Sequence, residues 1–144
     1  MRRAAADRLR AAGERVTPQR LAVAEALSAT GRPLSAEELW RRLRVGHGGI
    51  GRATVFRTLE ALVGAGVARR LELENHGSAY VACAANHHHH LACTGCGRVL
   101  EIDESYLRGI ASRVASDTGF VIDDARIDFY GRCVGCADAP STAP

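Results

Sequence analysis

Residues 83–101 concentrate side chains that bind metal ions. The segment reads Cys-Ala-Ala-Asn-His-His-His-His-Leu-Ala-Cys-Thr-Gly-Cys-Gly-Arg-Val-Leu-Glu, so nineteen residues carry three thiols, four imidazoles and one carboxylate. Thiolates and neutral imidazoles are the ligands that a borderline-soft cation such as Zn²⁺ prefers, at about 2.3 and 2.0–2.1 Å. One metal ion cannot use all of these groups. The sequence therefore predicts a metal-binding protein.

Two Cys-x-x-Cys pairs, formed by Cys93 with Cys96 and by Cys133 with Cys136, predict a site with four thiolate ligands. Two intervening residues allow a tight turn that directs both sulfur atoms toward one ion, and Gly97 suits the backbone after it. A redox dithiol is the alternative, but two pairs with the same spacing favour a structural zinc that contributes folding energy. The chain has five cysteines and no signal peptide or apolar run of membrane length. We therefore expect a cytoplasmic protein whose cysteines bind metal instead of forming disulfides.

The histidine run from His87 to His90 offers two further half-sites. Side chains alternate between the faces of an extended chain, so His88 and His90 would share one face and His87 and His89 the other. An expression-tag remnant or a set of surface histidines without a role is the alternative. A tag would be terminal, whereas this run is internal and leads into an apolar residue.

Two more residues are candidate ligands beside His88 and His90. Cys83, five residues before His88, would add a soft ligand, although a lone cysteine in a hairpin is also a common buried apolar residue. Glu101 would approach from a neighbouring strand. We predict a second metal site formed by Cys83, His88, His90 and Glu101.

The charge distribution divides the chain into two halves. Residues 1–84 carry 14 arginines against 8 acidic residues, a net charge of +6, whereas residues 85–144 carry 5 against 8, a net charge of −3. A basic half suggests a polyanionic partner. Two small domains would each have a thin core and would depend on a metal, a partner subunit or both.

The first half predicts a winged helix-turn-helix. Helices are expected over 2–12, from Pro18 behind the capping residue Thr17 to Gly31, from the capping box at 35–38 through Leu43, and over 52–64. Strands over 67–73 and 79–83, joined by a turn at 76–77, would form the wing. In the second half we expect a short strand at Leu91, a strand over 98–102, a helix over 104–118, a strand over 122–130 and a disordered tail. The fold class is α+β.

The helix over 52–64 is the predicted recognition helix. A helix of this kind inserts its first turns into the major groove, where arginine reads guanine and an apolar group contacts the thymine methyl. A solvated helix face with Phe56 in the core is the alternative. The candidate base contacts are Arg52, Thr54, Phe56 and Arg57, and the candidate backbone or minor-groove contacts are Arg15, Thr17 and Arg20.

These motifs in this order resemble the Fur superfamily of metal-responsive bacterial repressors. The resemblance runs from Arg15-Val-Thr-Pro-Gln-Arg20 through Ala53-Thr-Val-Phe-Arg57 and residues 87–96 to Cys133. It implies a DNA-binding winged helix over residues 1–84 and a small α/β dimerisation domain with a structural zinc over residues 85–144. It also implies a regulatory metal between them, and a homodimer that binds an AT-rich palindromic operator in double-stranded DNA when that metal is bound.

Within the superfamily, Cys83 is similar to the cysteine of the zinc-uptake regulators (Zur), where iron sensors commonly have glutamate and peroxide sensors aspartate. Cys83, His88 and His90 match the Zur regulatory site, and Glu101 matches a glutamate used in some members. The resemblance therefore implies a regulatory Zn²⁺, with Fe²⁺ or Mn²⁺ as alternatives.

The chain departs from the family pattern at several positions. Arg69 stands where an Asp or His ligand is usual on the first wing strand, which leaves Glu101, Glu72, Glu74 or His76 as fourth ligand. An accessory site would use His87 and His89, but its other two family ligands are replaced. Those two replacements are Arg108 and Ala125. Phe56 replaces the usual tyrosine of the recognition helix, and Arg32 replaces a histidine used by iron and peroxide sensors.

Three alternatives to a zinc-responsive repressor follow from the same residues. An iron-, manganese- or peroxide-sensing member of the superfamily would use the same histidines. A hydrolytic zinc enzyme would use His88 and His90 with an open coordination position, but the sequence contains neither the deaminase pattern nor His-Glu-x-x-His, so we expect no enzyme. A zinc-ribbon protein would bind nucleic acid whether or not a regulatory metal is present. We also expect no membrane association.

Overall fold

The chain divides into two compact units, residues Met1–Ala85 and Asn86–Pro144. The structure is a computed structural model that describes residues 2–46, 49–73, 77–83, 88–122 and 127–137. It combines helices and strands in both units, which confirms the predicted α+β class. In the described residues, no helix is both long and apolar enough to cross a membrane.

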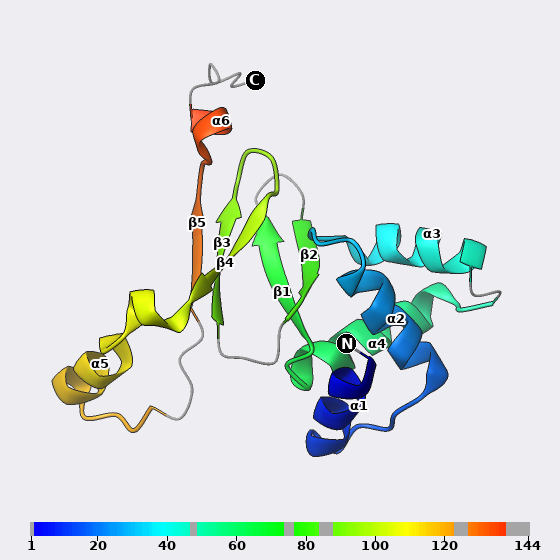
Figure 1. The fold of residues 1–144 in the computed structure, drawn as a ribbon, viewed down its shortest axis with the longest axis horizontal. Helices are drawn as coiled ribbons and strands as arrows, with labels where there is room; N and C mark the ends of the chain where they lie inside the picture. The colour runs from blue at the N-terminus through cyan, green and yellow to red at the C-terminus, as the bar shows by residue number, and fades with distance from the viewer. Residues whose placement is uncertain (1, 47–48, 74–76, 84–87, 123–126, 138–144) are drawn as a thin grey trace. The chain divides into compact units, whose positions relative to one another are not determined.

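The first unit contains four helices followed by a two-stranded hairpin (Figure 1). The helices are α1 (Arg2–Ala11), α2 (Pro18–Ser28), α3 (Ala36–Gly46) and α4 (Arg52–Gly64), and the strands are β1 (Ala68–Leu73) and β2 (Gly77–Ala82). Apolar residues at helical spacing meet in one core, whose fully buried leucines and valines are Leu9, Val23, Leu27, Leu34, Leu39, Leu43, Val55, Leu59 and Leu62. The predicted helices and the hairpin are thus confirmed, with small shifts at their ends.

Side-chain caps fix where α2 and α3 begin. The Thr17 hydroxyl accepts a hydrogen bond from the Arg20 amide at 3.2 Å, with Pro18 as the first helical residue. At α3, the Ser35 amide donates to Glu38 at 2.9 Å, and the Glu38 amide donates to the Ser35 hydroxyl at 3.2 Å. This reciprocal pair is the predicted capping box, which satisfies amides that the first helical turn leaves without partners.

The hairpin is tied to the helices by a third short segment. β1 and β2 pair antiparallel, from Ala68 opposite Ala82 to Leu73 opposite Gly77. Leu34, just before α3, exchanges two backbone hydrogen bonds with Tyr80 of β2, at 3.0 and 2.8 Å. The hairpin therefore has a fixed place beside the helices of its own unit, as a wing requires.

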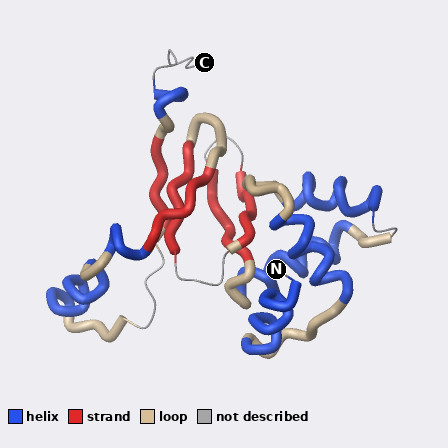
Figure 2. Tube along the Cα trace, in the orientation of Figure 1, coloured by secondary structure: helices blue, strands red, loops and turns tan. Residues whose placement is uncertain are grey.

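The second unit is built on a three-stranded sheet in the order β4-β3-β5 (Figure 2). The strands are β3 (His88–Cys93), β4 (Val99–Asp103) and β5 (Asp128–Gly131), with β3 antiparallel to β4 and parallel to β5. The helical segments are the 3-10 helix η1 (Glu104–Leu107), α5 (Ile110–Thr118) and α6 (Val134–Ala137).

Two predicted elements of this unit are wrong in extent. The single helix expected over 104–118 is interrupted, because Gly109 adopts a left-handed conformation with φ of 83° that only glycine adopts readily. Of the strand expected over 122–130, the structure shows Asp128–Gly131; residues 122 and 127 are not in a strand, and residues 123–126 lie outside the described part of the chain. Gly119, with φ of 74°, ends α5, and residues 120–122 after it have no regular secondary structure.

The second unit buries little apolar surface of its own. Among its described residues, only Ala92, Cys93 and Leu107 are buried hydrophobic residues, and α5 buries none. Leu91 of β3 is 38% exposed, and its cross-strand neighbours Leu100 and Phe129 are 47% and 38% exposed. A core this small needs support from a metal, a partner or both.

Candidate metal centres and nucleic-acid interface

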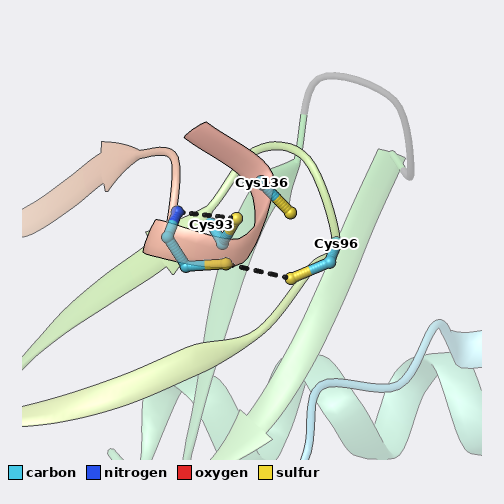
Figure 3. A group of neighbouring side chains, drawn as sticks. Cys93, Cys96 and Cys136 are labelled. Carbon is cyan, nitrogen blue, oxygen red and sulfur yellow. Dashed lines mark hydrogen bonds between the residues drawn. The ribbon is translucent and has the colours of Figure 1, made fainter. Parts of the chain in front are cut away.

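The four paired cysteines converge at one end of the sheet of the second unit (Figure 3). Cys93 ends β3, Cys96 follows in a turn, Cys133 follows β5 and Cys136 lies in α6. Their sulfur atoms all lie within 4.8 Å of one another. The Cys96 and Cys133 sulfurs are 3.8 Å apart, too far for a disulfide. A tetrahedral ion with Zn–S distances of about 2.3 Å separates its ligands by about 3.8 Å. The four thiols therefore fit a structural zinc.

Glycine residues allow the chain to close around this cluster. Gly97 has a left-handed φ of 71°, and its amide donates to the Cys93 carbonyl at 2.9 Å. A Cβ atom at Gly95 would lie 3.0 Å from both Cβ and Sγ of Cys136. The predicted role of Gly97 after the knuckle is confirmed, and the close approach of Gly95 to Cys136 is a second feature that spacing alone did not reveal.

Backbone amides favour the thiolate form of Cys93. The Cys133 amide donates to the Cys93 sulfur at 3.2 Å, and this bond, with those from the Cys96 and Gly95 amides, lowers the pKa of Cys93 to about 6. The pKa of Cys136 is raised to about 12, chiefly by its contacts with the sulfurs of Cys133 and Cys96. Several thiolates this close repel one another unless a cation neutralises them, so this geometry is suited to a bound metal ion.

A second group of ligand side chains lies on one face of the sheet. His88 and His90 share this face of β3, as alternation predicted, and their ring centroids are 4.9 Å apart. Glu101 lies opposite His90 on β4, and its carboxylate is 3.7 Å from Nε2 of His88. The structure thus brings together three of the four predicted regulatory ligands within the second unit.

Asp128 of β5 belongs to the same face and was not predicted. It pairs in register with His90, and its carboxylate lies 3.4 Å from Nδ1 of that ring. A carboxylate on one ring nitrogen orients a histidine to bind metal through the other. The sequence held no sign of this contact, because it depends on parallel pairing between strands far apart in the chain.

The opposite face of β3 carries His89, which is 1% exposed. Its Nε2 atom lies 2.7 Å from the carboxylate of Glu104 in η1. The accessory site was expected to lack an acidic ligand because Arg108 replaces the family's acid, yet the carboxylate of Glu104, four residues before Arg108, lies beside His89. His87 and Ala125 lie outside the described residues.

Cys83 directly follows β2 in the first unit. Its amide donates to the Val67 carbonyl at 2.9 Å, and its carbonyl accepts from Arg8 at 3.0 Å, so the backbone that carries the thiol is anchored. Its side chain is partly exposed. His88 is the fifth residue after Cys83, which limits their Cα atoms to about 18 Å of one another.

Position 69 is an arginine where a metal ligand was expected, and the residues predicted to serve as fourth ligand instead differ in their surroundings. Arg69 itself is a half-buried cation on β1, opposite Val81. Glu72 bonds to Arg70 at 2.7 Å and to Ser78 at 2.9 Å, and it pairs with Ser78 at the end of the hairpin away from Cys83. Glu74 and His76 lie outside the described residues. Of the described candidates, Glu101 is the one beside a histidine of the site.

One face of α4 exposes residues suited to a nucleic acid. Val55, Thr58, Leu59 and Leu62 are buried, whereas Arg52, Phe56 and Arg57 are exposed and Thr54 is partly exposed. Phe56 is 41% exposed, so it does not belong to the core. The guanidinium of Arg52 lies 5.9 Å from the centre of the Phe56 ring.

The predicted DNA contacts near α2 are exposed or partly exposed, and two of them also bond to neighbouring residues. Arg15 is exposed, but Arg20 forms an ion pair with Glu14 at 2.8 Å and donates to the Arg15 carbonyl at 2.6 Å. The Thr17 hydroxyl caps α2. Arg20 and Thr17 therefore order the chain before α2, and their contacts with DNA stay predictions.

Comparisons with known proteins agree with this architecture. The zinc uptake regulation protein of Mycobacterium tuberculosis is 35% identical over 126 residues, which cover 88% of this chain and 97% of that protein. The ferric uptake regulation protein of Bordetella parapertussis is 35% identical over 105 residues, covering 73% and 76%. A zinc uptake regulator solved with zinc and DNA is 28% identical, with a TM-score of 0.65, and the match covers 87% of this chain and 85% of that one.

A sequence profile of the ferric uptake regulator family matches residues 11–130, which include the predicted recognition helix, the histidine run and the first cysteine pair. The chain belongs to the ferric uptake regulator family.

Proposed function

We propose that this protein is a metal-dependent transcriptional repressor that senses zinc and binds an AT-rich palindromic operator as a homodimer. The observation that carries the choice of zinc is the thiol of Cys83, on an anchored backbone five and seven residues before His88 and His90, which share one face of β3. Thiolate with imidazole is a ligand set that suits zinc better than iron or manganese.

The similarity to relatives does not by itself select the metal. A zinc uptake regulator and a ferric uptake regulator are both 35% identical to this chain. The choice rests on Cys83. The alternative is an iron, manganese or peroxide sensor of the same superfamily, and iron and peroxide sensors commonly have a carboxylate in its place.

DNA binding is supported by the surface of α4 and by charge. Arg52, Phe56 and Arg57 project from its first two turns, where a recognition helix contacts base edges. Residues 1–84 carry a net charge of +6, from 14 arginines and 8 acidic residues. A similar zinc uptake regulator has been solved with zinc and DNA, which supports the same partner for this chain.

A homodimer would cover the apolar face of the second unit. Leu91, Leu100 and Phe129 lie side by side on three strands and are partly exposed. Exposed apolar surface of this kind marks an interaction site, and the small core of this unit needs the additional burial.

The regulatory metal would act by joining the two units. The ligands would be Cys83 from the first unit and His88, His90 and Glu101 from the second. Zinc bound there would favour the arrangement in which both recognition helices match two half-sites, because it binds that arrangement more tightly. Asp128 would hold the ring of His90, and the four-cysteine zinc would hold β3 to α6.

The proposal is tested by selecting bound sequences from randomised double-stranded DNA in the presence and absence of a mild chelator. Zinc content of the protein is measured in parallel. We expect a palindromic site that is lost on chelation while one zinc per chain remains bound. Sequence-specific binding that survives chelation would instead support a constitutive zinc-ribbon protein and would overturn the regulatory role.

A further inference from the structure

The first residue of α4, Arg52, is held at two points in the free protein. Its Nε atom lies 2.9 Å from a carboxylate oxygen of Glu37 in the first turn of α3. Its guanidinium also lies over the ring of Phe56, one helical turn further along α4. An arginine whose side chain is 62% exposed would otherwise sample many rotamers, so these contacts restrict it before any partner binds.

Helix stability does not explain an arginine at this position. The positive end of the helix dipole lies at the first turn and disfavours a cation there, and α4 has no acidic residue in that turn. Gly51 precedes the helix without a side-chain cap. An exposed ion pair contributes only about 0–1 kcal/mol. The residues at the start of α4 therefore contribute little to helix stability, and this points to a role for Arg52 in binding.

The geometry of the ion pair suits recognition of guanine. Glu37 approaches the Nε side of Arg52, whereas the two terminal nitrogens form the edge that pairs with O6 and N7 of guanine. The second oxygen of Glu37 lies 3.6 Å from Arg41. Two arginines thus flank one carboxylate, so the local charge stays positive toward a phosphate backbone.

Phe56 limits where such a guanine can lie. Its exposed ring has no hydrogen-bonding group, so the base contact open to it in the major groove is the thymine methyl. The Arg52 guanidinium is 5.9 Å from the ring centre, less than two base-pair steps of about 3.4 Å. A guanine read by Arg52 would therefore lie within two base pairs of a thymine contacted by Phe56.

We propose that Glu37 is a positioning residue that presents Arg52, which lies over the ring of Phe56, to a guanine located within two base pairs of a thymine in each operator half-site. This inference rests on the proposed function, because it requires α4 to be the recognition helix. It adds a base preference and the residue that enforces it.

The test compares DNA sequences selected by the full-length, zinc-loaded wild-type protein and by variants. For R52A we expect the preference for one guanine in each half-site to fall roughly 5- to 150-fold, with the other positions unchanged. R52K keeps the charge but lacks the fork that pairs with guanine, so it should lose the same preference while retaining the salt dependence of binding. R41A, which removes the other partner of Glu37, should keep the guanine preference.

The variant E37Q separates positioning from simple charge. If Glu37 positions Arg52, E37Q lowers the guanine preference at the same position. If Glu37 acts only as a negative charge near DNA, E37Q tightens binding to all sequences equally, and the inference is wrong. A wild-type protein that selects a site unaffected by R52A also overturns it. A wild-type protein that selects no sequence would instead refute the proposed function itself.

Discussion

Cys83 is the residue on which the proposed choice of metal depends. The paired histidines and Glu101 would serve zinc, iron or manganese, whereas a thiolate favours the softer ion. Its backbone is fixed by Val67 and Arg8, so substitution of the sulfur alone should leave the first unit folded.

We predict that Cys83→Ser raises the free zinc concentration needed for operator binding by at least about 10-fold, because one ligand is lost from the regulatory site. DNA binding by fluorescence anisotropy in zinc buffers measures this shift. Cys93→Ser serves as the contrasting variant and should lose the folded dimer. An unchanged zinc dependence of Cys83→Ser would remove Cys83 from the site.

Gly95 offers a test of the four-cysteine site that leaves every ligand in place. A methyl group at Gly95 would collide with Cys136 at 3.0 Å, whereas one at Gly135 would meet nothing within 4 Å. We expect Gly95→Ala to destabilise the knuckle by about 1–3 kcal/mol and to release zinc to a chromophoric chelator faster than wild type. Gly135→Ala is the matched control. Equal release from both variants would contradict the packing described for this cluster.

At the scale of elements, features that depend on neighbouring residues could be predicted from the sequence, whereas pairing between distant strands could not. The capping box at Ser35 and Glu38 is a pattern of neighbouring residues, and it starts α3 where expected. The paired faces of the histidine run follow from strand alternation alone. The contact of Asp128 with His90 joins strands far apart in the chain, and no spacing rule predicts which strands pair.

Two further features could not be predicted from the sequence: the break in the helix over 104–118 and the exposure of Phe56. The sequence predicted one helix over 104–118, but Gly109 takes a left-handed conformation between η1 and α5. Phe56 could be placed on α4 from the sequence, but only the packing of Val55 and Leu59 shows that its ring is left exposed.

The capping box makes a prediction about stability and pH. The backbone and hydroxyl hydrogen bonds of Ser35 lower the pKa of Glu38 below its usual value of 4.5. The ionised carboxylate therefore contributes stability above about pH 4.5, and this contribution is lost as the pH falls through the lowered pKa.

We expect Ser35→Ala to cost about 1 kcal/mol of unfolding free energy at pH 7, and the difference from wild type to shrink below pH 4.5. Urea unfolding followed by the fluorescence of Trp40, the single tryptophan, reports on the unit that contains α3. Ser35→Thr keeps the hydroxyl and should restore most of the loss. A difference that grows in acid would contradict the assigned role of Glu38.

At the scale of the whole molecule, the two units differ in how they are stabilised. The first has a continuous apolar core, and residues 1–84 carry a net charge of +6. The second buries few apolar side chains and carries two clusters of candidate ligands. Its stability should therefore depend on the four-cysteine zinc and on a second copy of the chain.

Leu91 tests the proposed dimer. Leu91→Glu would bury an unpaired charge in the interface and should weaken the dimer on the order of 100-fold or more, as measured by analytical ultracentrifugation. Val45→Glu, at a valine that is 85% exposed in the first unit, is the control and should leave the dimer intact. A Leu91→Glu dimer as tight as wild type would place the interface elsewhere.

The most direct test of the central claim is operator binding by protein that holds only its structural zinc, titrated with buffered free Zn²⁺, Mn²⁺ and anaerobic Fe²⁺. We predict that zinc activates binding at a far lower free concentration than either of the other ions, because Cys83 contributes a thiolate. Activation by iron or manganese, with zinc ineffective at its own buffered concentration, would contradict the assignment and identify the protein as an iron- or manganese-responsive member of the family.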